Sequence, residues 1–127
     1  MKKVLITGGA GYLGSVLTEV LLNKGYKVTV IDNLIYKQTS VAPFSYNDNF
    51  KFILGDVRDN SILKSLVDEH DIIIPLAAIV GMPACKAQPE ATVDINYKQV
   101  QNIVNWASND QMIMIPNTNS QYGSSTE

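Results

Sequence analysis

The chain has 127 residues and a formal net charge of −2, with 46% hydrophobic and 17% charged residues. This length fits one domain rather than two, and the composition is that of an ordinary globular protein. The charge argues against nucleic acid and anionic membranes as partners, and no apolar run is long enough to span a bilayer. The sequence therefore predicts a single domain that binds neither nucleic acid nor a membrane.

The chain contains one cysteine, Cys85, and one histidine, His70. A single cysteine excludes an internal disulfide and agrees with a reducing cytoplasm. We expect Cys85 to be a half-buried thiol, and His70, within the charged stretch VDEHD, to be a solvated turn residue. His and Cys residues do not recur at metal-ligand spacing, so no metal site is predicted.

The first half of the chain alternates between strand and helix patterns. Residues 2–7 read as a strand, 12–25 as a helix closed by Gly25, 26–32 as a second strand and 50–56 as a third. Residues 33–49 read as a loop with at most one irregular turn. Apolar residues at i, i+3, i+4, i+7 and i+8 predict the inner face of the helix: Leu13, Val16, Leu17, Val20 and Leu21.

The second half continues the alternation. A helix is predicted over 61–69, with Asp59 as a plausible N-cap and with inner residues Ile62, Leu63, Leu66 and Val67. A strand over 71–78 is expected to bend or end at Pro75. A long helix over 89–108, with an apolar stripe of Val100, Ile103, Val104 and Ala107, precedes a strand over 111–117 and a turn-like tail. This order predicts an α/β fold with a doubly wound, Rossmann-like parallel sheet of about five strands.

Glycines cluster where the first strand meets the first helix. Gly9, Gly11 and Gly14 satisfy G-x-G-x-x-G, and Gly8 with the last two satisfies G-x-x-G-x-x-G. Such a turn lets the backbone approach a pyrophosphate, which the N–H groups of the helix N-terminus can bind. Asp32 ends the second strand eighteen residues after Gly14, where a carboxylate binds ribose hydroxyls and repels a 2′-phosphate. The pair of signals predicts an NAD site rather than an NADP site.

The stretches TGGAGYLGS, VIDN, GDVRD, PLAA, DINY and NTNSQYG, in this order and spacing, resemble the extended short-chain dehydrogenase/reductase family. More narrowly, they resemble its NAD-dependent nucleotide-sugar epimerases and dehydratases, over essentially the whole chain. The resemblance implies an enzyme that moves a hydride between sugar C4 and the nicotinamide, with a nucleotide-activated sugar as substrate and a homodimer when full length.

The resemblance also implies the roles of individual residues. The pyrophosphate would be held by the glycine loop, the ribose by the end of the second strand and the adenine by the residues after the third. Small residues after the fourth strand would line the nicotinamide, and Asn96 would steady the active-site strand. In that order the cofactor-binding residues are Gly8, Gly11, Tyr12, Leu13, Gly14, Asp32, Asn33, Asp56, Val57, Leu76, Ala77, Ala78, Asn96, Pro116 and Asn117. Thr118 would be the catalytic hydroxyl that hydrogen-bonds the reacting sugar oxygen.

The sequence departs from the family pattern at three places. Pro75 replaces a residue that is often histidine, and Asn119 and Ser120 replace the acidic pair of 4,6-dehydratases, which disfavours dehydratase chemistry. None of the six tyrosines is followed four residues later by lysine, so the family's Tyr-x-x-x-Lys pair is missing.

We therefore expect residues 1–127 to be an incomplete NAD-binding domain, without the catalytic helix and the substrate domain. Such a chain would at most bind NAD and would not convert a substrate. The alternative is a non-catalytic NAD-binding or sensing module of the same fold. A flavodoxin-like FMN domain is a weaker alternative, because Asp32 and the glycine spacing do not suit it.

Overall fold

The structure is a computed structural model, and it describes residues 1–80 and 82–117. Five parallel strands form one sheet in the order β3-β2-β1-β4-β5. They are β1 (Lys3–Thr7), β2 (Lys27–Asp32), β3 (Phe50–Leu54), β4 (Ile72–Pro75) and β5 (Met112–Ile113). The predicted doubly wound parallel sheet is confirmed.

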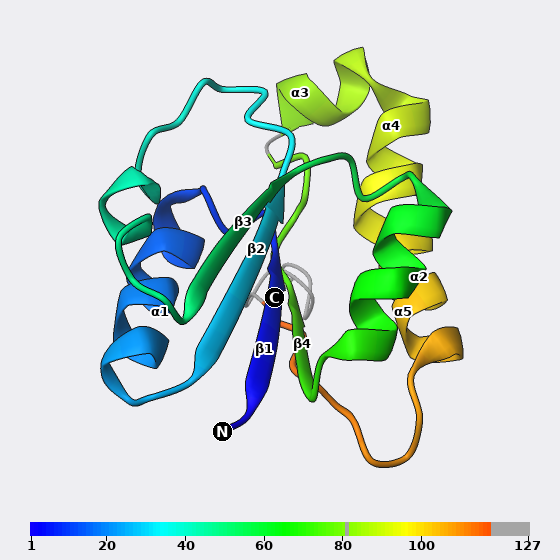
Figure 1. Cartoon of the computed structure of the whole chain (residues 1–127). Helices are drawn as coiled ribbons and strands as arrows, with labels where there is room; N and C mark the ends of the chain where they lie inside the picture. The colour runs from blue at the N-terminus through cyan, green and yellow to red at the C-terminus, as the bar shows by residue number, and fades with distance from the viewer. Residues whose placement is uncertain (81, 118–127) are drawn as a thin grey trace, which may run out of the picture.

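Helices cover both faces of the sheet, as Figure 1 shows. Helix α1 (Tyr12–Asn23) lies on one face, and α2 (Asn60–Glu69), α4 (Pro89–Val93) and α5 (Gln99–Trp106) lie on the other. The central strand β1 is buried on both sides, with Val4 and Ile6 in the core under α1 and Leu5 in the core under α2 and α5. The alternation follows from the two-residue period of a strand.

The segment between β2 and β3 is a loop, as predicted, with one 3₁₀ turn, η1 (Ala42–Phe44). Phe44 packs edge-to-face against Phe50 with ring centroids 5.7 Å apart, and Val41 is buried. These apolar side chains fix a connection that has no regular helix of its own.

The predicted inner face of α1 is largely wrong. Gly14, Thr18 and Leu22 are its buried residues, whereas Leu13, Val16 and Val20 are exposed. Leu17 and Leu21 are half-buried and pack against the core under α1. The C-terminal end of α1 matches the prediction, because Gly25 has φ +91°. The amides of Gly25 and Tyr26 donate to the carbonyl oxygens of Leu22 and Leu21, respectively, in a Schellman motif.

Helix α2 begins where predicted. The Asp59 carboxylate accepts hydrogen bonds from the amides of Ser61 (3.1 Å) and Ile62 (3.3 Å), which caps the helix. Leu63, Leu66 and Val67 are buried, while Ile62 lies at the margin of exposure.

His70 follows α2 and is buried, contrary to the expectation of a solvated turn residue. Its Nδ1 lies 2.6 Å from the carbonyl oxygen of Leu66, and desolvation lowers the pKa of its imidazole. The charged side chains that act on it are Lys3, Glu69 and Asp71. The charged neighbours of His70 suggested a solvated turn, but its imidazole ring folds back onto the C-terminal end of α2.

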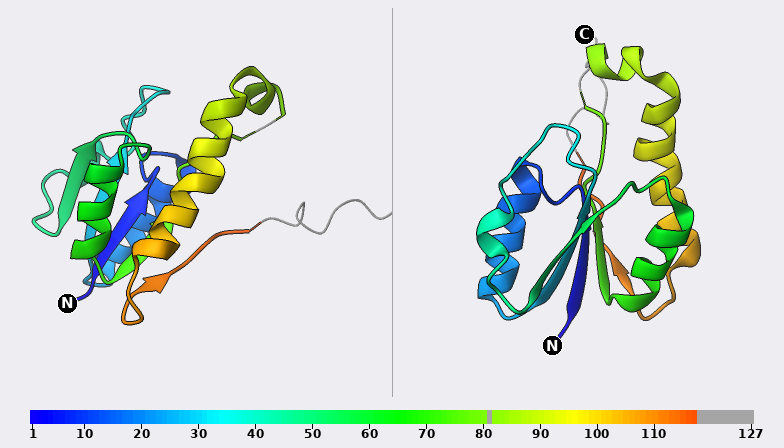
Figure 2. Two further views of the ribbon diagram at one scale, coloured as in Figure 1. Left: turned by 90° about the vertical axis from the view of Figure 1, so that its right-hand side faces the viewer. Right: turned by 45° about the horizontal axis from the view of Figure 1, so that its top comes forward.

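The long helix predicted over 89–108 is interrupted by a π-helical segment, η2 (Asp94–Lys98), between α4 and α5. Figure 2 shows the three segments as one continuous rod beside the sheet. A short helix, α3 (Met82–Ala87), precedes them and was not predicted. The predicted stripe is only partly right, because Ile103 is buried but Val104 is 50% exposed and polar Gln99 is 1% exposed.

The last two strands are shorter than predicted. Strand β4 ends at Pro75, as a proline without an amide donor requires, and Leu76 then donates its N–H to Thr7 O at 2.9 Å. Strand β5 pairs with β4 and ends at Ile113. Within the described residues, no helix has the length and apolarity that crossing a membrane demands.

Protonation of His70 is expected to lower the free energy of unfolding as the pH falls from 7.5 to 5.5. The unfolded imidazole takes up a proton near its ordinary pKa of about 6.5, whereas the folded one, with its lowered pKa, resists it. His70→Asn keeps a donor for Leu66 O but does not titrate. Urea unfolding at both pH values should show a smaller loss of unfolding free energy in the variant than in the unaltered chain. Equal losses would contradict a lowered pKa of His70 in the folded state.

Candidate functional site

Most of the predicted site residues lie at the carboxyl ends of the strands. The glycine loop follows β1, Asp32 ends β2 and Asn33 comes directly after it, Asp56 follows β3, and Leu76–Ala78 follow β4. The chain runs outward from β1 to β3 and then crosses back to β4 beside β1. Ligands of open parallel sheets bind at such a reversal of strand order, outside the carboxyl ends of the strands.

Two glycines allow close backbone contacts in the loop after β1. Gly8 has φ +69°, and a Cβ placed on it would lie 2.6 Å from the N and Cα atoms of Ala77. A Cβ on Gly14 would lie 2.5 Å from Gly9 Cα. The loop therefore packs directly against the segment after β4 and against the first turn of α1.

The N-terminus of α1 is suited to an anion. Its N-cap, Gly11, has no side chain with which to cap the helix, and no acidic residue lies in the first turn. A Cβ on Gly11 would meet only Gly8 O, at an ordinary contact distance of 3.4 Å, so protein atoms do not crowd this side of the turn. The first N–H groups of a helix lack intrahelical partners and carry a partial positive charge, which favours phosphate groups.

The peptide groups on both sides of Ala10 are held from two directions. The Asp32 Oδ2 atom accepts the Ala10 N–H at 3.1 Å, and the Ser40 hydroxyl donates to Ala10 O at 2.6 Å. Asp32 Oδ1 accepts the N–H of Leu34 at 2.8 Å. Each carboxylate oxygen of Asp32 thus has one protein donor and retains acceptor capacity for a ligand hydroxyl.

Leu34 lies in the left-handed region with φ 53°, which costs a residue with a Cβ about 1 kcal/mol. The strain places the Leu34 amide against Asp32 Oδ1. Strained backbone of this kind persists where surrounding contacts impose it. Here the contact is with Asp32, the residue that is predicted to bind the ribose.

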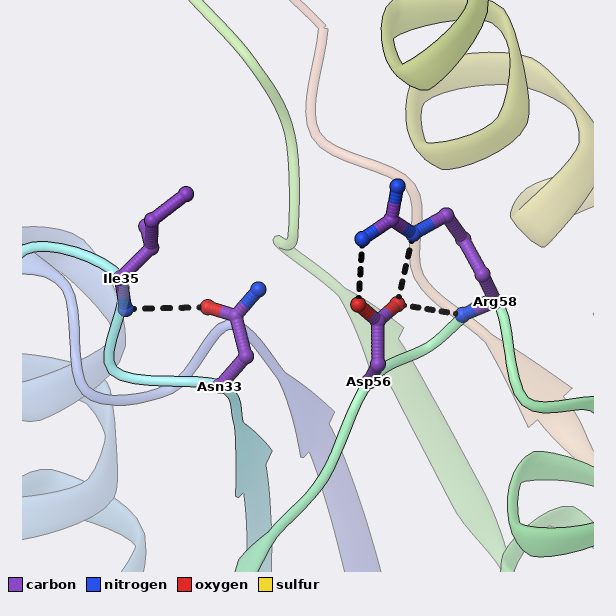
Figure 3. A network of polar contacts seen from close by, with 4 residues as sticks. All are labelled: Asn33, Ile35, Asp56 and Arg58. Carbon is purple, nitrogen blue, oxygen red and sulfur yellow. Dashed lines mark hydrogen bonds and ion pairs between the residues drawn. The ribbon is translucent and has the colours of Figure 1, made fainter.

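Asn33, Asp56 and Arg58 form the outer part of the site, as Figure 3 shows. Asp56 Oδ1 accepts from the amide (2.8 Å) and Nε (2.9 Å) of Arg58, and Oδ2 accepts from Nη2 at 2.6 Å. These side-chain hydrogen bonds hold the pKa of Asp56 below its ordinary value, against a smaller opposing effect of burial. Val57 turns its side chain into the core under α2.

A buried polar network supports the segment after β4. Thr7 Oγ1 donates to Gln99 Oε1 at 2.6 Å and accepts from Ala77 N at 3.3 Å. Gln99 Nε2 donates to the carbonyl oxygens of Ala77 (3.0 Å) and Ile95 (2.8 Å). The network ties the ends of β1 and β4 to α5 and satisfies both ends of the Gln99 amide.

Asn96, in the π-helical segment η2, holds the same region. Its Oδ1 accepts the N–H of Ile79 and its Nδ2 donates to Ile79 O, both at 2.8 Å. Pro116 and Asn117 are exposed and lie in irregular chain beyond β5. Thr118, Asn119 and Ser120 lie outside the described residues.

Three residues of the site were missed by sequence reasoning: Ser40, Gln99 and Arg58. Ser40 lies in a loop without periodicity and offered no signal. Gln99 offered one, as a polar residue facing the same way as Ile103, four positions on. Arg58 stands in the motif GDVRD, in which only the two aspartates and Val57 were assigned roles from the sequence. Among the described residues, no group of three His, Cys, Asp or Glu side chains could hold a metal ion.

Comparison with known proteins gives a consistent result. The model of the family described as "NAD dependent epimerase/dehydratase family" matches residues 4–127. The chain is 32% identical to UDP-N-acetyl-alpha-D-glucosaminuronate decarboxylase of Bacillus cytotoxicus over 126 residues, which are 98% of this chain and 39% of that protein. It is 33% identical to UDP-glucose 4-epimerase of Neisseria meningitidis serogroup B over 76% of this chain and 30% of that protein.

A solved structure agrees. The UDP-glucose 4-epimerase from Stenotrophomonas maltophila, with bound NAD and formylated UDP-arabinopyranose, superposes with a TM-score of 0.83 at 25% identity, covering 100% of this chain and 40% of that one. The chain therefore spans about two fifths or less of the length of these relatives.

Replacing Gly14 by alanine is expected to lower the free energy of unfolding by about 2 kcal/mol, because the new Cβ meets backbone atoms of Gly9 that cannot rotate away. Gly11→Ala is the matched control, since its Cβ meets only Gly8 O at an ordinary contact distance of 3.4 Å and costs only the weaker N-cap preference of alanine. Urea unfolding measures both. A loss for Gly14→Ala no larger than for Gly11→Ala would show that the close contact is not a constraint.

Proposed function

The chain belongs to the NAD-dependent epimerase/dehydratase family, and we propose that it is the NAD-binding portion of a nucleotide-sugar epimerase or 4-dehydrogenase. The observation that carries the proposal is the pairing of an open helix N-terminus at Gly11 with the Asp32 carboxylate, both at the point where the strand order reverses. These are the groups that a dinucleotide's pyrophosphate and ribose need.

The residues of the site divide between the parts of the cofactor. The N–H groups of Tyr12, Leu13 and Gly14 would bind the pyrophosphate, and Gly8 keeps that loop against the segment after β4. Asp32 and Asn33 would accept hydrogen bonds from the ribose, and Asp56 would take the adenine amino group while the next amide, that of Val57, meets a ring nitrogen.

The opposite end of the site would receive the nicotinamide. Leu76, Ala77 and Ala78 follow β4, and the small side chains of the two alanines leave room for a ring. Asn96 supports this segment through Ile79, and Gln99 supports it through Ala77. NAD supplies the hydride acceptor when bound. Pro116 and Asn117 would lie beside it, with Thr118 as the hydroxyl that hydrogen-bonds the reacting sugar oxygen.

The proposal for the whole protein extends beyond these 127 residues. A nucleotide-activated sugar would be its substrate, C4 the site of hydride transfer and a homodimer its assembly, in the cytoplasm. No Tyr-x-x-x-Lys pair occurs within the sequence, so the residues present account for cofactor binding and not for the proton transfer that such a pair performs. On this basis the 127-residue chain alone is proposed to be inactive. A non-catalytic sensing module remains the second candidate for the same reason.

Titration calorimetry tests the cofactor assignment directly. NAD is expected to bind at least about tenfold more tightly than NADP, because Asp32 accepts the ribose hydroxyls and repels a 2′-phosphate. Asp32→Asn should reduce this ratio to about threefold or less. The ratio compares two ligands on one variant, so a general loss of stability cancels. Tighter binding of NADP by the unaltered chain would refute the assignment.

A second test uses the open space at the helix N-terminus. Gly11→Ala places a methyl group where the pyrophosphate would approach, and NAD binding is expected to weaken at least about tenfold. Circular dichroism should show that the variant keeps its fold. Unchanged affinity in a folded variant would mean that the phosphates do not bind at this turn.

A further inference from the structure

We propose that Arg58 is a positioning residue, which holds the Asp56 carboxylate so that it accepts an amino group, and no carbonyl oxygen, from the purine of the bound dinucleotide. This inference rests on the proposed function. It assigns the selectivity for the adenine base to a pair of side chains, Asp56 and Arg58, rather than to Asp56 alone.

The hydrogen bonds of Asp56 leave one direction open. Oδ1 accepts from both the amide and Nε of Arg58, at 2.8 and 2.9 Å, and Oδ2 accepts from Nη2 at 2.6 Å. A carboxylate has about four acceptor positions, so the three bonds from Arg58 leave about one, on Oδ2. The Asn33 side chain also acts on this carboxylate and lowers its pKa further. The two side-chain bonds form a planar fork, shown in Figure 3, that fixes the rotation of the carboxylate.

The ion pair also fixes what the remaining position can bind. An aspartate carboxylate is ionised at neutral pH, and the hydrogen bonds and charge of Arg58 lower the pKa of Asp56 further, so the group is an acceptor with no proton to donate. An exocyclic amino group satisfies such an acceptor. A carbonyl oxygen in the same place on the ring would face a charged oxygen without a hydrogen between them, and binding would weaken.

The position of Asp56 in the fold fits the base end of the dinucleotide. Leu54, the last residue of β3, pairs with Asp32 at the end of β2, and Asp56 follows two residues later. Asn33 lies on the opposite side, with its Oδ1 bound to the N–H of Ile35 at 3.1 Å. Figure 3 shows the Asn33 amide nitrogen on the side that faces Asp56. The base would lie beyond the ribose, along this edge.

Arginine suits this task better than lysine would. Its guanidinium matches the carboxylate with two parallel bonds, whereas an ammonium group offers a point charge without a fixed orientation. The Arg58 side chain is 44% exposed, so its removal leaves the core untouched. Asp94, at the start of η2, is the other charged group that acts on Arg58.

The test compares the binding of NAD with that of nicotinamide hypoxanthine dinucleotide, which carries a carbonyl oxygen in place of the adenine amino group. The unaltered chain is expected to bind NAD at least about tenfold more tightly. In Arg58→Ala this ratio should fall below about threefold, because the freed carboxylate can turn away, and Arg58→Lys should lie between. Affinity for the hypoxanthine analogue should change less than twofold in either variant.

Lys64→Ala is the matched control, because it removes another exposed ion pair, with Asp68 at 2.8 Å on the outside of α2. Its ratio should equal that of the unaltered chain. Equal weakening of both dinucleotides in Arg58→Ala would overturn the proposal, since it would indicate a contact or a structural role that does not read the base. A ratio near one in the unaltered chain would also overturn it while leaving NAD binding intact. Failure to bind either dinucleotide would instead refute the proposed function.

Discussion

The absence of side chains in the turn after β1 is the constraint on which the rest of the structure depends. Gly14 brings the first turn of α1 into contact with Gly9, and Gly8 brings the same loop against Ala77 after β4. A helix, a turn and a neighbouring strand end thereby meet at backbone distance. The open N-terminus of α1 and the segment after β4 can face one ligand only because these contacts leave nothing between them.

Buried polar side chains of β1 and α5 stabilise this junction. Thr7 and Gln99 are buried and bound to each other and to Ala77, so the end of β4 is fixed by hydrogen bonds rather than by apolar packing alone. Loss of one partner would leave a buried donor or acceptor unsatisfied, which costs about 1–3 kcal/mol. Asn96 of the π-helical segment bonds both the N–H and the carbonyl of Ile79, so two amide side chains of the same helical rod hold three consecutive peptide units.

Carboxylates organise the other side of the junction. Asp32 bridges the glycine loop and the strained Leu34, and Asp56 is bound through its whole carboxylate to Arg58. In both carboxylates, protein donors occupy some of the acceptor positions and thereby set the direction in which the remaining positions can accept a hydrogen bond. A donor-rich ligand, such as a ribose or an aminopurine, matches such an edge because each of its hydroxyl or amino groups meets a preset acceptor.

The sequence by itself determined the order and type of the strands, the turn at Gly8–Gly14, the cap at Asp59, the helix end at Gly25 and the end of β4 at Pro75, because each depends on a few neighbouring residues. Only the tertiary structure decided which faces are buried. Close approach at Gly14 turns α1 so that Thr18 and Leu22, on the same side of the helix, meet the sheet. Leu13, Val16 and Val20 of the predicted apolar stripe are left exposed. Gln99 and His70 are buried for a similar reason: their partners, Thr7 and the Leu66 carbonyl, become available only when the elements pack, and periodicity along one segment contains no information about them.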